Sequence, residues 1–239
     1  MNEFIRGFLD NDSTFGRLMN KCYIIIAANI TFMIFSIPFF TIGPGFIALY
    51  HVMLRALRED YDINPFKEFW KGFKSNFKQG MVIWILAILF AIVILGDVQI
   101  CQQAGGFIGM FRYPLYMMGL IGLILFLFVL PVTAAFADDI KGLFRNAFYF
   151  AAKKPFKLLV ILFFDVFPLY LTYTDPQYMP LYGFLWITCG FGLVSMLGAA
   201  LLLPEFKPFL DKDHPHDEGD YDDFDEAKMM EDLRKMDGL

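Results

Sequence analysis

The sequence predicts an all-α fold, a polytopic helical membrane protein with about six transmembrane helices and two cytoplasmic amphipathic helices. Hydrophobic residues make up 57% of the 239 residues, charged residues make up 19%, and the mean hydropathy is +0.51. A soluble domain averages about 45–50% apolar and about 25% charged residues. Several uncharged runs also approach the roughly 20 residues that a helix needs to cross a bilayer. Basic residues gather between these runs, as they do in cytoplasmic loops.

Five runs with at most one charged residue are the clearest predicted spans. They cover residues 22–42, 81–96, 113–137, 158–174 and 181–203. Their length favours helices, because barrel strands would alternate in polarity over segments of about ten residues. The shorter run 45–57 is either a sixth span or the returning arm of a hairpin.

Positive charge favours the sixth span and sets the topology. The loops 55–78 and 138–157 are rich in Lys and Arg, and Arg6, Arg17 and Lys21 precede the first span. Cytoplasmic loops collect these residues, so both loops and the N-terminus are predicted to lie inside. The chain must then cross the membrane twice between residues 21 and 55. We therefore expect a multi-pass protein of the cell membrane with both termini cytoplasmic.

Charge also divides the chain into three predicted parts. Residues 1–20 form a cytoplasmic interfacial segment, residues 21–207 a transmembrane helical domain, and residues 208–239 an acidic cytoplasmic tail. The balance of basic over acidic residues is +3 for residues 1–204 and −8 for residues 205–239. Nucleic acid is not an expected partner, because binding to phosphate requires clustered Lys and Arg.

Two segments of the predicted cytoplasmic loops have the pattern of amphipathic helices. In residues 64–78, Asn64 suits an N-cap and Pro65 suits the first helical position. Aromatic residues then recur at helical spacing with lysines beside them, which is typical of a helix that lies at a membrane surface or docks a partner. The segment 138–154 repeats the pattern more weakly. The predicted partner-docking residues are Phe66, Lys67, Phe69, Trp70, Lys71, Phe73, Lys74, Arg145 and Phe148.

Two polar residues fall inside predicted spans, Asp165 and His51. A carboxylate at the depth of Asp165 is costly unless it faces a polar cavity or a partner. It either coordinates a proton or an ion, or makes a structural polar contact near Pro168. His51 has the same two interpretations. The small residues Gly119 and Gly122 would let helices approach closely, either within the chain or with another subunit.

Motifs for catalysis are absent from the sequence. There is no Gly-rich phosphate loop, no HExxH motif and no nucleophile elbow. The three cysteines have no CxxC spacing, and His214 and His216 lack further metal ligands around them. We therefore expect no enzymatic activity, no cofactor and no metal ion.

Several motifs together resemble the YesL-like family of bacterial membrane proteins. The resemblance begins with residues 12–20 and Ser36-Ile37-Pro38, and its most specific part is the turn Thr41-Ile42-Gly43-Pro44, with Thr41, Gly43 and Pro44 as its turn residues. It continues in Tyr50, residues 66–80, Leu130-Pro131-Val132-Thr133 and Arg145-Asn146-Ala147. The acidic tail lies outside it.

The resemblance implies a biological setting rather than a mechanism. Members of the family have no established function and bring no catalytic residues. They are often encoded beside sugar-uptake ABC transporters and polysaccharide-degrading enzymes in Gram-positive bacteria.

The leading hypothesis is a non-enzymatic accessory or regulatory membrane subunit of a carbohydrate ABC importer. Its expected partners are the lipid bilayer and the permease or ATPase subunits, which it would dock through its cytoplasmic amphipathic helices. One alternative is an autonomous small-solute carrier or channel that uses Asp165. The other is an oligomeric membrane scaffold, and a homo-oligomer is compatible with all three hypotheses.

Overall fold

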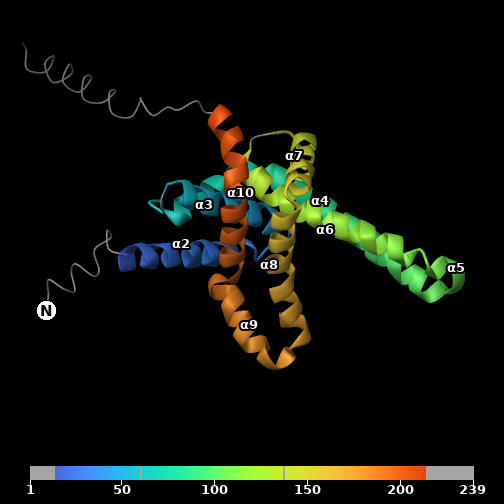
Figure 1. The fold of residues 1–239 in the computed structure, drawn as a ribbon. Helices are drawn as coiled ribbons and strands as arrows, with labels where there is room; N and C mark the ends of the chain where they lie inside the picture. Colours follow the sequence, from blue (N-terminus) through green and yellow to red (C-terminus); the bar gives the residue numbers. More distant parts are fainter. Residues whose placement is uncertain (1–13, 60, 137, 214–239) are drawn as a thin grey trace, which may run out of the picture. The chain divides into compact units, whose positions relative to one another are not determined.

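The computed structural model of the chain describes residues 14–59, 61–136 and 138–213, and these residues form helices with no strand among them. The predicted all-α class is confirmed. The elements in chain order are α2 (Thr14–Phe35), η1 (Phe39–Thr41), α3 (Ile42–Arg58), α4 (Pro65–Ala104), α5 (Gly106–Gly109), α6 (Arg112–Ala135), α7 (Ile140–Lys153), α8 (Pro155–Thr174), η2 (Pro176–Tyr178), α9 (Met179–Leu185), η3 (Trp186–Gly190) and α10 (Phe191–Asp213) (Figure 1).

Six segments of the described residues are long and apolar enough to cross a membrane. They are Phe15–Phe35, Phe39–Arg58, Pro65–Ala104, Gly106–Ala135, Pro155–Thr174 and Pro176–Leu210. The second contains the short run 45–57, which gains length from η1 and the start of α3. The predicted polytopic membrane protein with about six spans is therefore confirmed by length and composition.

The chain divides into two compact units between Leu203 and Pro204, within α10. Of the second unit, the structure describes only helical residues as far as Asp213. Most of the predicted interfacial segment 1–20 and most of the acidic tail, including His214 and His216, lie outside the described residues.

Helix α4 differs from the sequence prediction in its extent. The segment 64–78 was expected to be a separate cytoplasmic helix, but it continues without a break into the apolar span. The whole helix has 40 residues, which corresponds to a length of about 60 Å. Its start is as predicted, because the Asn64 Oδ1 accepts hydrogen bonds from the backbone N–H groups of Phe66 and Lys67, both at 3.1 Å, and Pro65 is the first helical residue. No residue inside the segment breaks the helix, so the amphipathic half and the apolar half form one rigid rod.

Helix α3 packs closely against the first half of α4 because glycines stand where the two helices cross. A Cβ atom on Gly80 would lie 2.8 Å from the Cα of Pro44, and one on Gly43 would lie 2.7 Å from the carbonyl oxygen of Gly80. The turn that leads into α3 is held by Thr41, whose Oγ1 lies 2.5 Å and 2.6 Å from the carbonyl oxygens of Phe35 and Pro38. The turn residues Thr41, Gly43 and Pro44 therefore set the packing of α3 on α4.

The apolar half of α4 runs beside α6, and the short helix α5 joins them (Figure 1). Gly122 of α6 faces the ring of Phe90, and a Cβ on Gly119 would lie 3.4 Å from the Ile94 Cγ2. The two glycines are thus used for packing within the chain. The alternative was that these glycines pack against another subunit. Their face of α6 is instead covered by α4 of the same chain.

Helix α2 is joined to the π-helical segment η3 by one buried asparagine. The Asn29 Nδ2 donates to the carbonyl oxygens of Trp186, at 3.0 Å, and Ile187, at 2.7 Å, and its Oδ1 accepts from the Gly192 N–H at 2.8 Å. A π-bulge leaves backbone groups without their usual helical partners, and in a membrane each such group must be satisfied within the protein. Asn29 satisfies three of them.

The substitution Gly80→Ala tests the close approach of α3 to α4. We expect it to lower the free energy of unfolding by about 1–3 kcal/mol, because the new methyl group would meet backbone atoms of Pro44. Gly96→Ala is the matched control in the same helix, since a Cβ there has nothing within 4 Å. It should be neutral or stabilising by up to about 1 kcal/mol. Unfolding of the detergent-solubilised variants measures both, and equal effects would contradict the packing described.

Candidate functional site

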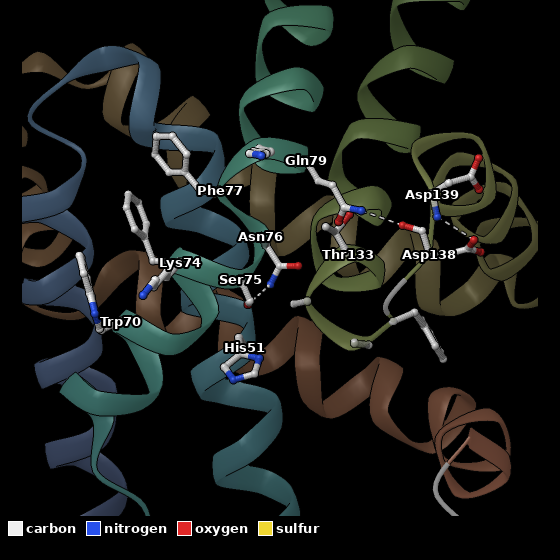
Figure 2. Close-up of a pocket in the computed structure, with 15 residues that line it drawn as sticks. His51, Trp70, Lys74, Ser75, Asn76, Phe77, Gln79, Thr133, Asp138 and Asp139 are labelled. Carbon is white, nitrogen blue, oxygen red and sulfur yellow. Dashed lines mark hydrogen bonds between the residues drawn. The ribbon is translucent and has the colours of Figure 1, made fainter.

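An open cleft of about 1170 Å³ lies between α4 and the end of α6 (Figure 2). One wall comes from α4, the other from the end of α6 and the connection to α7, and His51 of α3 lies between them. Its lining residues are His51, Trp70, Phe73, Lys74, Ser75, Asn76, Phe77, Lys78, Gln79, Thr133, Ala134, Ala135, Phe136, Asp138 and Asp139. The cleft thus separates the two segments that the sequence predicts to be amphipathic.

The α4 wall combines aromatic rings with basic and amide side chains. Phe73 packs its ring 5.1 Å from that of Phe35 on α2, which orients this face of the helix. Trp70 stacks on Phe73 with ring centres 6.1 Å apart, yet 54% of its surface is exposed. Lys74 follows one turn later and is also exposed. An exposed tryptophan beside a lysine, fixed by a buried ring, is a surface suited to recognition by a protein partner.

A charged network lies beneath the cleft between α3 and α4. The His51 Nε2 lies 3.3 Å from the Glu68 Oε2, and the Arg55 Nε lies 3.5 Å from the same oxygen. Arg55 also pairs with Glu59, at 2.9 Å, on the exposed side. Glu68 is only 9% exposed, and a carboxylate so buried requires partners of opposite charge or hydrogen-bond donors. The network therefore fixes the register of α3 on α4 at this end of their contact.

The position of His51 depends on a glycine of α4. A Cβ on Gly72 would lie 2.8 Å from the Cβ and Cγ atoms of His51. Any larger residue at position 72 would displace the imidazole from Glu68. The glycine thus places His51 at the base of the cleft (Figure 2).

Hydrogen bonds connect the opposite wall to α4. The Gln79 Nε2 donates to the backbone carbonyl oxygen of Asp138 at 2.7 Å, and Figure 2 shows its side chain reaching across from α4. The Asp138 carboxylate accepts from the Asp139 N–H, at 2.8 Å, and from the Asn146 Nδ2, at 3.2 Å. Asp139 in turn caps α7 by accepting from the Gly142 N–H at 3.0 Å. Both aspartates are thereby engaged in shaping the wall.

Two of the nine predicted docking residues are buried and seven are exposed. Phe69 is 0% exposed and Phe73 is also buried, and both rings pack against Phe35 of α2, so neither offers the exposed docking surface that was predicted. The other seven are exposed: Phe66, Lys67, Trp70, Lys71, Lys74, Arg145 and Phe148. The start of α4 packs on α2 and α3, whereas α7 packs on α6, so the exposed residues form two surfaces on different helix pairs, with the cleft between the segments.

The two predicted intramembrane polar residues have different surroundings. His51 lines the cleft and pairs with Glu68. Asp165 of α8 does not line it. Its Oδ2 is buried without a hydrogen-bond partner.

Sequence reasoning missed Glu68, Gln79 and Asp138. The burial of Glu68 could have been predicted from the sequence. Glu68 precedes Gly72 by four residues, so both lie on the same face of α4, which is the buried face. Gln79 and Asp138 meet across 59 residues of chain, and no local pattern predicts that contact. In the part of the chain that the structure describes, no three His, Cys, Asp or Glu residues are grouped to hold a metal ion.

The fold defines a polytopic helical membrane protein, and one comparison finds a similar family. A family model described as "Protein of unknown function, DUF624" matches residues 25–98. DUF624 is the YesL-like family, so the resemblance of the sequence to that family is confirmed over these residues. The match includes the turn at Thr41, the whole of α3 and the α4 wall of the cleft. No curated protein and no solved structure matches the chain.

The substitution Glu68→Ala tests the charged network. Removing this carboxylate removes the ion-pair partner that Arg55 and His51 share. We expect the free energy of unfolding to fall by about 2 kcal/mol. Glu59→Ala is the control, because Glu59 also pairs with Arg55 but is exposed, and such pairs contribute about 0–1 kcal/mol. Chemical denaturation in detergent compares the two variants. A larger loss for Glu59→Ala would mean that the network does not hold α3 on α4.

Proposed function

We propose that the chain is a non-enzymatic accessory or regulatory membrane subunit of a carbohydrate ABC importer. In this proposal the permease or the ATPase of the importer docks at the cleft between α4 and the end of α6. The observation that carries the proposal is the cleft itself, which is lined from both amphipathic segments and flanked by exposed Trp70 and Lys74.

The chemistry of the cleft favours a protein partner. Its lining mixes aromatic rings with lysines, amides and hydroxyls, and tryptophan is enriched among residues that contribute most to protein interfaces. The segments on either side lie in the loops that positive charge predicts to be cytoplasmic, where an ATPase or the loops of a permease are accessible. The carbohydrate importer is suggested by the setting that the YesL-like family implies.

An autonomous carrier or channel is the second candidate function. The observation in its favour is the buried, unpartnered Oδ2 of Asp165, because a carboxylate inside a span is costly unless it has a role. Such a protein would need no partner. Purification of the chain from its native membrane therefore distinguishes the two candidate functions, because a subunit would be recovered with its partner and a carrier would be recovered alone.

A pull-down of the tagged chain from its native membrane in mild detergent tests the proposal. The wild-type chain should recover an ABC permease or ATPase in stoichiometric amount. The double variant Trp70→Ala/Lys74→Glu should recover about tenfold less, because a tryptophan at the centre of an interface contributes about 2 kcal/mol or more and 1.4 kcal/mol is tenfold in affinity.

The matched control is Phe156→Ala/Lys154→Glu, which removes an exposed aromatic ring and reverses an exposed lysine at the start of α8, away from the cleft lining. It should recover the partner as the wild type does. Recovery of the wild-type chain alone would contradict the proposal and favour the carrier. Equal recovery by both double variants would exclude the cleft as the docking site.

A further inference from the structure

A second pocket, of about 440 Å³, lies between α8 and the hairpin arm formed by α9, η3 and the start of α10. All of its lining residues belong to segments apolar enough to span a membrane. They are Phe164, Pro168, Leu171, Thr172, Tyr182, Leu185, Trp186, Cys189, Gly190, Leu193, Val194 and Leu197. The lining contains no charged side chain.

Hydrogen bonds near the two ends of α8 connect it to η3 and α10. Near the start of the helix, the Lys157 Nζ donates to the carbonyl oxygen of Leu201 at 2.9 Å. Near its end, the Trp186 Nε1 donates to the Thr172 Oγ1 at 3.0 Å. The two contacts are about 22 Å apart along the helix axis. Between them α8 has one buried residue, Ile161, so in the part of the chain that the structure describes this helix is only lightly covered by other elements.

The Thr172 hydroxyl and the Trp186 indole N–H of the lining already have hydrogen-bond partners. The Thr172 Oγ1 donates to the carbonyl oxygen of Pro168 at 2.8 Å while it accepts from Trp186. Asn29 of α2 satisfies the carbonyl oxygens of the π-helical segment. In the described residues, the buried side-chain N and O atoms without a hydrogen-bond partner belong to Ser36, Arg55 and Asp165, and none of these residues lines the pocket. Water needs two to four polar partners to occupy a cavity, so this pocket does not suit water.

We propose that the pocket binds the hydrocarbon chain of a membrane lipid. An uncharged lining made mostly of apolar side chains is complementary to an aliphatic chain. At the depth of the spans, the acyl chains of lipids surround the protein. The pocket volume lies in the range of about 300–1,000 Å³ that is typical of small-molecule sites. Its walls follow two helices over two or more turns, from residue 164 to 172 and from 182 to 197, which favours an elongated occupant. The lipid chain would supply the packing that α8 lacks.

Fluorescence quenching by lipids with brominated acyl chains tests the proposal. Trp186 lines the pocket, and Trp70→Phe with Trp84→Phe leaves it as the only tryptophan of the full chain. In vesicles of brominated phosphatidylcholine, Trp186 should be quenched strongly. Val194→Phe, which fills the pocket, should reduce that quenching by about half or more, since a pocket of this kind encloses most of its ligand. Val166→Phe is the matched control, because Val166 is exposed on α8 and does not line the pocket.

Two results would overturn the proposal. Absence of quenching in the Trp186-only chain would mean that protein, such as a second copy, covers the pocket. Equal quenching in the Val194→Phe and Val166→Phe variants would mean that Trp186 senses only the bulk bilayer.

Phospholipid content after purification gives a second readout that does not depend on tryptophan. The wild-type chain and Val166→Phe should retain phospholipid in stoichiometric amount through extensive detergent washing, and Val194→Phe should lose it. Thermal unfolding confirms that each variant is folded. Full retention by folded Val194→Phe would contradict the site.

Discussion

The contacts around the cleft depend on how closely α3 approaches α4. Gly43 and Gly80 allow the two backbones to meet at one end of the crossing, and Gly72 leaves room for His51 at the other. That approach brings His51 and Arg55 to the buried carboxylate of Glu68. Because α4 is one continuous helix, the same crossing also orients Trp70 and Lys74 on its outer face. The turn Thr41-Ile42-Gly43-Pro44, which resembles the YesL-like family, thus has a role in helix packing.

The sequence was sufficient to predict the class of fold and several local features. Hydropathy and positive charge predicted about six spans, and Asn64 with Pro65 predicted the start of α4, because these signals act over a few neighbouring residues. Periodicity also predicted the aromatic stripe of α4. It could not show that Phe69 and Phe73 face Phe35 within the chain, since a stripe has the same spacing whether it meets another helix or a partner protein. The cleft needs contacts between distant residues, such as Gln79 with Asp138, and these have no local signal.

Two cavities of the described residues have opposite chemistry. The cleft beside α4 is rich in aromatic, basic and amide groups and borders the predicted cytoplasmic segments. The pocket beside α8 is apolar and lies within the predicted spans. In our proposals the first receives a subunit of a transporter and the second a lipid chain, so partner binding and membrane packing occupy separate helix pairs. Changes at one cavity can then be made with little direct effect on the other.

Site-specific photo-crosslinking in native membranes tests most directly whether the cleft is the docking site. A photoreactive amino acid in place of Ser75, which lines the cleft, would label whatever lies there, and the same substitution at Tyr173, which is 88% exposed on α8, serves as the reference position. Our account predicts an adduct with an ABC permease or ATPase polypeptide from position 75 and none with that polypeptide from position 173. Adducts from position 75 that contain only lipid, or only a second copy of the chain, would contradict it.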